Sequence, residues 1–326
     1  MSNSPSVELS LMPGHFVVTA LDDLRRPLEI IEAIGAESAA DLIVFGPNAD
    51  SSALDLIERA ITEQPQADVI VVCDPNDPAR RSSLRGELPP LLSLLAASPT
   101  GDPAVAVSAK ALREQVASAP DGTGLQGLTM RVAISGNVLF VPSDSSTASP
   151  LRLKSSLTMP TSGPKATRLR DFIISLPLPT AKPNSPDVVA LRAGLLLLND
   201  FFDESHLCSQ SIEGDQNADY WHAILHRREP DYGNAKYWFQ HVGRHAVFGE
   251  LVPSVSTMFL RATGSLAGKL ERWQPHLITA SGWEPFAFVD LCEAAESDAE
   301  LRTWCEEVQF VEMMLLLAST YRDSVG

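Results

Sequence analysis

Histidine is concentrated in one stretch of the chain. Five of the seven histidines fall within 40 residues, and these five are His206, His222, His226, His241 and His245. A neutral imidazole binds transition metals through a ring nitrogen, and the same side chain exchanges protons near neutral pH. We therefore expect any metal or acid–base chemistry of this protein in this stretch.

The spacing of these residues indicates a metal site on helices. His222 and His226 stand four apart, so a helix places both rings on one face, where they can bind a single ion. Asp203 precedes His206 by three residues and His226 precedes Glu229 by three, a carboxylate–imidazole spacing used by metal sites in helical bundles. The sequence predicts a site for a divalent transition metal, with these candidate ligands: His206, His222, His226, His241 and Asp203.

A purely structural role for the histidines is an open alternative. The pattern HxxxH is short and arises often by chance, and histidines also cap helices or bond to backbone carbonyls. Gly243 lies between His241 and His245, which makes a continuous helix there less favourable. Ala223 stands where the HExxH motif of zinc proteases has its glutamate, so that class is excluded.

The segment 220–239, YWHAILHRREPDYGNAKYWF, combines aromatic and charged residues. Aromatic walls with a few polar groups often line small-molecule pockets, and arginines hold anions bidentately. The same residues can equally form a buried ion-pair network among core aromatics, and both interpretations stay open. The pocket interpretation predicts substrate contacts from Arg227, Arg228, Lys236, Trp221, Trp238 and Tyr237, with Glu229 and Asp231 as the catalytic carboxylates.

A resemblance covers most of the C-terminal half. The motifs AGLLLLND, ESHLCSQSI, YWHAILHRREPDYGNAKYWF and VGRHAVF, within residues 191–251, resemble an uncharacterised helical family of bacterial and fungal proteins. The likeness continues into WEPFAFVDLCEAA at residues 283–295. It implies a shared helical module and no particular reaction, and it does not extend to the N-terminal half.

Composition narrows the classes of partner. The 326 residues include 25 Lys and Arg against 41 Asp and Glu, a net charge of −16. No run of basic residues offers a surface for phosphates, so we do not expect nucleic acid as a partner.

The N-terminal residues lack the pattern of a secretory signal, and no apolar run approaches the roughly 20 residues of a membrane span. We therefore expect no membrane association. Four scattered cysteines without a CxxC pair are typical of reduced thiols, and we expect a cytoplasmic protein.

The N-terminal half, residues 1–141, alternates two patterns. Apolar runs rich in β-branched residues, at 16–20, 41–45, 68–73 and 104–107, alternate with amphipathic segments at 28–34, 53–61 and 84–96. This alternation predicts an α/β domain with a mainly parallel sheet. Two further runs, 130–134 and 138–141, predict an antiparallel hairpin around Ser135-Gly136-Asn137.

The remainder divides into a linker and a helical domain. Residues 142–186 are rich in Pro, Ser and Thr, which is typical of a linker, with one extended strand expected at 172–176. Residues 187–326 have helical periodicity and predict an all-α domain. We expect one helix through 188–212, a second at 219–228 that ends before Pro230, and a third that reaches Gly243. Later helices are expected at 255–260, 285–296 and 299–321.

Two motifs do not support a cofactor. The GxGxxG match at 122–127 follows a helix-like segment and precedes a strand-like one, whereas a dinucleotide turn leaves a strand and enters a helix. Asp74 and Asp77 follow a strand without a phosphate-binding loop, so we interpret them as turn residues. No nucleotide cofactor is expected. Two functions stay open: metal-assisted hydrolysis of a small anionic substrate, or a non-catalytic ligand-binding or interaction module.

Overall fold

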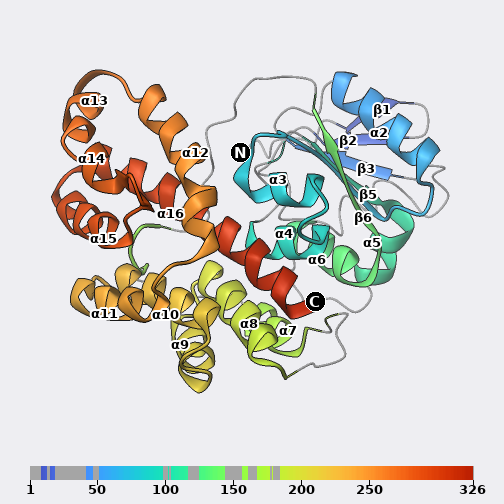
Figure 1. The fold of residues 1–326 in the computed structure, drawn as a ribbon. Helices are drawn as coiled ribbons and strands as arrows, with labels where there is room; N and C mark the ends of the chain where they lie inside the picture. The colour runs from blue at the N-terminus through green and yellow to red at the C-terminus, as the bar shows by residue number, and fades with distance from the viewer. Residues whose placement is uncertain are drawn as a thin grey trace, which may run out of the picture. The chain divides into compact units, whose positions relative to one another are not determined.

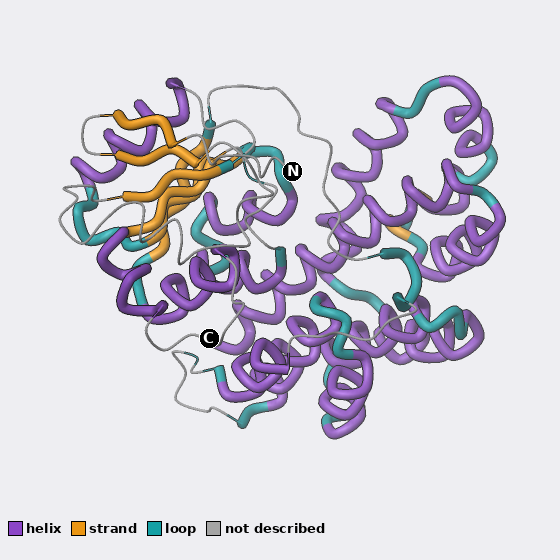
Figure 2. The backbone as a smooth tube through the Cα atoms, turned by 180° about the vertical axis from the view of Figure 1, so that it is seen from behind, coloured by secondary structure: helices purple, strands orange, loops and turns teal. Residues whose placement is uncertain are grey.

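The protein divides into two compact units, Met1–Arg152 and Leu153–Gly326. Figures 1 and 2 show a mixed sheet with helices in the first unit and almost entirely helices in the second. The boundary between the units falls inside the segment 142–186. The structure is a computed structural model, and it describes residues 9–12, 15–18, 42–46, 51–97, 102, 104–116, 125–143, 156–160, 167–176, 178 and 184–325.

The first unit is built on a six-stranded mixed sheet. Its strands, in spatial order, are β1 (Leu9–Met12), β2 (His15–Val18), β3 (Leu42–Phe45), β5 (Ala104–Ser108), β4 (Val69–Cys73) and β6 (Val138–Pro142). The pairs β2–β3 and β4–β6 are parallel, and the other three are antiparallel. The prediction of a mainly parallel sheet is therefore wrong. The apolar runs of β4 and β5 reflect burial on both faces, and such burial does not specify strand direction.

Helices cover both faces of this sheet. Residues alternate along β4, so that Ile70 and Val72 pack towards one helix while Val69 and Val71 pack towards the opposite group. The helices of this unit are α2 (Ser51–Glu63), α3 (Pro78–Leu84), α4 (Pro90–Ala96), α5 (Ala109–Val116) and α6 (Leu125–Ser135). Of these, α2 lies on the side of Ile70, and α4, α5 and α6 contribute to the other side.

Several predicted elements differ from the structure. The segment 130–134 lies in α6 and not in a hairpin, because its apolar residues Leu128, Val132 and Ala133 recur at helical spacing and are buried. The segment 84–96 is interrupted at Pro89 and Pro90, and α4 begins there. Residues 125–127 of the GxGxxG match lie in the first turn of α6, where a strand was expected, and residues 122–124 lie outside the described residues. The amphipathic segment 28–34 lies outside the described residues.

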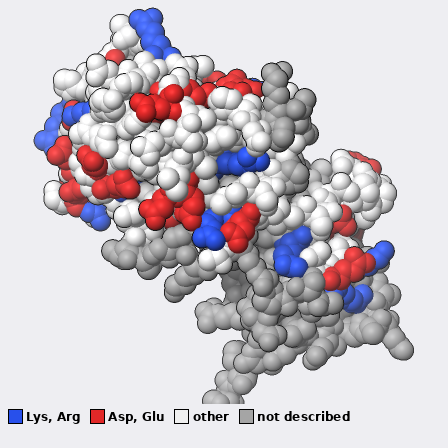
Figure 3. Space-filling model, turned by 90° about the horizontal axis from the view of Figure 1, so that it is seen from below, with Lys and Arg blue, Asp and Glu red and all other residues white. Residues whose placement is uncertain are grey.

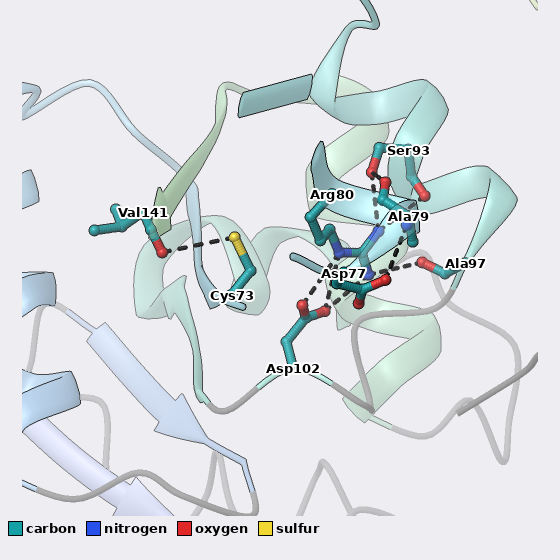
Figure 4. A network of polar contacts seen from close by, with 8 residues as sticks. All are labelled: Cys73, Asp77, Ala79, Arg80, Ser93, Ala97, Asp102 and Val141. Carbon is teal, nitrogen blue, oxygen red and sulfur yellow. Dashed lines mark hydrogen bonds and ion pairs between the residues drawn. The ribbon is translucent and has the colours of Figure 1, made fainter. Parts of the chain in front are cut away.

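A buried arginine joins α3, α4 and the loop before β5 (Figure 4). Arg80 donates from Nε and Nη2 to the carboxylate of Asp102, which lies 2.8 Å from Nη2, and from Nη1 to Ser93. Asp77 accepts from the Ala79 N–H at 2.8 Å and caps α3, while Asp74 accepts from the Asn76 N–H at 2.8 Å. These contacts confirm the turn role expected for Asp74 and Asp77.

The second unit is helical. Its helices are α7 (Thr167–Ser175), α8 (Pro186–Leu198), α9 (Phe202–Ser211), α10 (Gln216–Arg228), α11 (Tyr232–Val242), α12 (Ala246–Arg261), α13 (Gly264–Glu271), α14 (Gln274–Leu277), α15 (Pro285–Ala294) and α16 (Ala299–Val325). A 3-10 turn, η3 (Ala295–Ser297), precedes α16, and β7 (Ile278–Thr279) pairs with β8 (Gly282–Trp283). Among the described helices, none has the length and apolar character of a membrane span.

The helix ends follow local chemistry, with two departures from expectation. The predicted helices ending before Pro230 and at Gly243 are confirmed as α10 and α11. The helix expected through 188–212 is split into α8 and α9, because Asp200 adopts a left-handed φ of 63° that no helix tolerates. The strand expected at 172–176 is wrong, since that segment overlaps α7 and buries Ile173 and Leu176.

Part of the expected linker belongs to the core of the helical unit. Leu157 is 2% exposed and packs in the cluster formed by α12, α15 and α16. Its neighbours are held through the backbone: Gln309 donates to the carbonyls of Ser156 and Leu157, and the Met159 N–H donates to the carbonyl of Arg228. The segment 156–160 therefore contributes to the fold and does not act as a spacer.

Candidate metal centre

The helix α10 presents different chemistry on its two sides. Asp215 caps it by accepting from the Ala218 N–H at 2.9 Å, and every residue from Asn217 to Arg228 is buried among α8, α9, α11 and α16. Trp221 faces α8 and α16, where its indole donates to Thr320 at 3.2 Å. His222 faces α9 and α11 instead. The helix therefore separates a packing side from a histidine side.

The histidine side brings three imidazoles together. His222 and His226 stack with ring centroids 4.7 Å apart, as their four-residue spacing on one helix predicts. His206, from α9, lies edge-on to both, with centroids 4.6 Å from His222 and 5.4 Å from His226. One ring nitrogen from each of the three lies within 4.8 Å of the others, a grouping that can hold a metal ion.

His222 is the most enclosed member of the group. It is 1% exposed, and its ring stacks on Trp238 of α11 with centroids 3.9 Å apart. Burial lowers the pKa of His222 to about 3, with smaller contributions from His226 and His206, so the ring is neutral at neutral pH. Neither of its ring nitrogens has a hydrogen-bond partner among the residues that the structure describes. Buried polar atoms almost always have a hydrogen-bond partner, so the two ring nitrogens of His222 are an exception that requires an explanation.

His226 has a partner for each of its ring nitrogens. Its Nδ1 lies 2.9 Å from a carboxylate oxygen of Glu229, and its Nε2 lies 3.1 Å from the side-chain nitrogen of Asn234. A carboxylate accepts hydrogen bonds, so Nδ1 carries the proton and Nε2 keeps its lone pair. A carboxylate in this position is also the usual outer partner of a metal-binding histidine.

Two of the predicted ligands lie outside the group. His241 is exposed near the end of α11, and its Nδ1 lies 2.9 Å from the carbonyl oxygen of Tyr237 in the same helix. Asp203 is exposed in the first turn of α9. Both assignments as ligands are corrected, because sharing a helix with a neighbouring residue does not by itself direct a side chain into the interior.

The two arginines predicted to hold an anion are already engaged inside the protein. Arg227 is 1% exposed and donates from Nη2 to Glu312 of α16 and from Nε to Gln309. Arg228 is fully buried, pairs with Asp200 at 2.7 Å and donates to the carbonyl of Leu197 at 2.7 Å. The prediction that they bind substrate is corrected: both are buried and paired, as the alternative expected, but their partners Glu312 and Asp200 lie outside the segment 220–239.

The other predicted pocket residues are dispersed. Lys236 pairs with Asp290 on α15, Tyr237 is 50% exposed and Trp238 is buried against His222. Trp221, on the opposite side of α10, is fully buried and does not join them.

The two carboxylates predicted to be catalytic have local partners. Glu229 bonds His226, as described above, and Asp231 caps α11 by accepting from the Asn234 N–H at 3.1 Å. Asp231 therefore performs the ordinary work of a helix cap. Glu229 instead supports one of the three clustered histidines.

Sequence reasoning missed several polar residues that matter here. Asn234 follows His226 by eight residues and has no feature that would mark it as a partner. Gln309 and Glu312 are fully buried, and they interrupt an otherwise apolar stretch of α16, VQFVEMMLLLA. A polar pair within such a stretch is a signal of a buried network, since an unpaired buried charge is very costly.

Comparison with protein-family models, with curated proteins and with solved structures gave no match for this chain. The resemblance of the C-terminal half to a helical family is therefore an expectation from its motifs alone.

Proposed function

We propose that the helical unit binds a divalent transition metal ion through His206, His222 and His226. The observation that carries this proposal is the buried ring of His222, which has no hydrogen-bond partner among the described residues and lies against two further imidazoles. A metal ion would give that ring the partner it lacks.

The donor set favours particular metals. Imidazole nitrogens suit zinc, copper and nickel, whereas magnesium and calcium prefer oxygen ligands. Tetrahedral zinc with nitrogens at about 2.0–2.1 Å needs nitrogens about 3.3 Å from one another. The present nitrogens lie within 4.8 Å, so the three rings must draw closer. His206 is half-buried on a separate helix and can supply much of that movement.

Three protein ligands leave a fourth position for water. That arrangement is typical of catalytic zinc sites, where the ion lowers the pKa of bound water to about 7. We therefore propose metal-assisted hydrolysis as the activity of the loaded protein. Arg227 and Arg228 are unavailable to orient an anionic substrate, because both are buried and paired.

Zinc titration of the metal-stripped, full-length protein tests the proposal. We expect one ion per chain by calorimetry, with affinity lowered at least about 100-fold in His222→Ala, the upper end of what loss of an outer-shell partner costs. His241→Ala is the matched control, since that histidine lies on a neighbouring helix outside the group. Hydrolysis of phosphate and carboxylate esters, assayed on the same samples, should require both zinc and His222. Failure of the wild-type protein to bind zinc, copper or nickel would overturn the proposal.

The stack of Trp238, His222 and His226 favours one second candidate, a non-catalytic module in which the histidines only pack. In that case zinc leaves the melting temperature unchanged. Stabilisation by zinc that depends on His222 distinguishes the two, because a ligand that binds the folded state alone raises its stability.

A further inference from the structure

We infer that Asn234 competes with the metal ion for His226 and thereby sets the affinity of the site. This inference rests on the proposed metal binding. It concerns the side-chain amide of Asn234, which lies 3.1 Å from Nε2 of His226 and reaches it from α11, across the turn that joins α10 and α11.

The protonation of His226 identifies the atom for which they compete. Glu229 faces Nδ1 at 2.9 Å and has only acceptor oxygens when ionised, so the proton of the neutral ring is on Nδ1. The single lone pair of that ring is then on Nε2. Asn234 donates an N–H to the same lone pair that a metal ion would need.

Metal entry therefore exchanges one interaction for another. The hydrogen bond from Asn234 to Nε2 breaks, a bond from Nε2 to the ion forms, and the proton on Nδ1 remains with its carboxylate partner. Glu229 thus acts as a positioning residue, because its acceptor oxygens hold the proton of the ring on Nδ1 and leave Nε2 to face Asn234. At His222 an ion would meet no such competitor, because neither ring nitrogen has a hydrogen-bond partner among the described residues.

The backbone around Asn234 does not depend on its amide. The Asn234 N–H donates to Asp231 at 3.1 Å, so the first turn of α11 is capped independently of the Asn234 side chain. Alanine is also the best helix former. Asn234→Ala should therefore remove the competing donor and leave α11 intact.

The test compares zinc affinities by chelator competition in the full-length protein. We expect Asn234→Ala to bind zinc about 2- to 10-fold more tightly than wild type, the range that one neutral hydrogen bond represents. Asn234→Ser, whose side chain is too short to reach His226, should also bind zinc more tightly than wild type. It replaces the alanine variant in the test if that variant folds poorly. Gln240→Ala, at an exposed position of the same helix, is the control and should leave affinity unchanged.

Glu229→Ala should have the opposite effect, a loss of about 10- to 100-fold in zinc affinity, because Nδ1 then has no acceptor to hold its proton. General damage to the fold weakens binding in every variant, so opposite signs separate competition from damage. Equal or weaker binding by both Asn234 variants, in a wild-type protein that does bind zinc, overturns this inference and leaves the metal site standing. A wild-type protein that binds no zinc, copper or nickel overturns both.

Discussion

At the scale of single residues, the helical unit encloses an ion pair between two of its longest side chains. Arg227 and Glu312 are both essentially unexposed, and Tyr220 donates to the second carboxylate oxygen of Glu312 at 2.8 Å. Arg227 also lies over the ring of Phe288, with its guanidinium carbon 4.6 Å from the centroid. A charge this deep is tolerable only while its partner is present.

We predict that Arg227→Met destabilises the protein by about 3–5 kcal/mol, because it leaves Glu312 charged and buried without a counter-ion. The double variant Arg227→Met/Glu312→Gln should recover a large part of that loss, since the amide oxygen still accepts from Tyr220. Urea unfolding of the two single variants and the double variant measures the coupling between the sites. Additive losses would contradict a direct ion pair.

His245 gives the fold a dependence on pH. It caps α12, with Nδ1 accepting from the Val247 N–H at 3.2 Å, and its Nε2 donates to Asn217. Burial lowers the pKa of His245, against smaller opposing effects of Asp323 and Asp215. Its folded pKa thus lies below the unfolded value of 6.5, so its contribution to stability is present above pH 6.5 and is lost as the pH falls.

We therefore predict that His245→Asn loses less stability than wild type between pH 7 and pH 5. Asparagine is a good cap and does not titrate, whereas protonation of Nδ1 removes the acceptor that holds the Val247 N–H. Urea unfolding of both proteins at the two pH values provides the measurement, and His245→Ala should cost about 1 kcal/mol at pH 7. Identical pH dependence in wild type and His245→Asn would show that His245 does not titrate with folding.

The candidate site was predictable from sequence only where its residues share one helix. The four-residue spacing of His222 and His226 indicates a shared face, and their rings do stack. The ion pair of Arg227 with Glu312 could not be predicted, because Glu312 lies 85 positions away on another helix. Asn234 is closer in sequence, but its reach to His226 depends on how the Pro230 turn folds α11 back.

At the scale of elements, α8 and α10 approach closely through a glycine. A Cβ placed on Gly194 would overlap the indole of Trp221, so this contact requires the absence of a side chain. The same edge of the indole is also held by the hydrogen bond from its Nε1 to Thr320 of α16. These three helices thus meet at one point in the core.

We predict that Gly194→Ala destabilises the protein by about 1–3 kcal/mol, the usual effect of overpacking, despite the better helix propensity of alanine. Gly268→Ala is the matched control on α13, where nothing lies within 4 Å of the added atom. That variant should be neutral or slightly stabilising. The melting temperatures of the two variants provide the measurement. Equal melting temperatures would mean that the Trp221 side chain moves to make room for the added methyl group.

The elements themselves were predictable where termination signals are strong. Pro230 and Gly243 end α10 and α11 as expected. The apolar run 130–134 was misassigned because a short run of this kind is compatible with a strand or with a buried helix. The direction of β5 also could not be predicted from the sequence, since the run AVAV is buried on both faces whichever way the strand runs.

At the scale of the whole molecule, charge is distributed as the composition suggests. The net charge is −16, and on the face drawn in Figure 3 the described Lys and Arg side chains lie in separate small groups among acidic and uncharged ones. The helical unit, for its part, extends into the Pro- and Ser-rich region of the sequence through Leu157. Composition therefore describes the surface of this protein better than it describes the limits of its folded units.

We predict that a fragment of residues 161–326 melts at a lower temperature than a fragment of residues 153–326. The shorter fragment lacks Leu157, whose burial contributes about 1.5–3 kcal/mol, and it leaves Gln309 and Arg228 without their backbone acceptors at Ser156. Circular dichroism melting of the two fragments provides the comparison. Leu157→Ala in the full-length protein should show a loss of about 2–5 kcal/mol on its own. Equal melting temperatures would place residues 156–160 outside the folded unit.

The stacking of Trp238 on His222 gives the protein an optical probe of its own. An indole 3.9 Å from an imidazole senses the electronic state of that ring, so a change of charge or of coordination at His222 alters the light that Trp238 emits. Trp221 faces the opposite side of α10, towards α8 and α16, and therefore does not sense the cluster in this way. Events at the histidine cluster can thus be followed by fluorescence without attaching a dye.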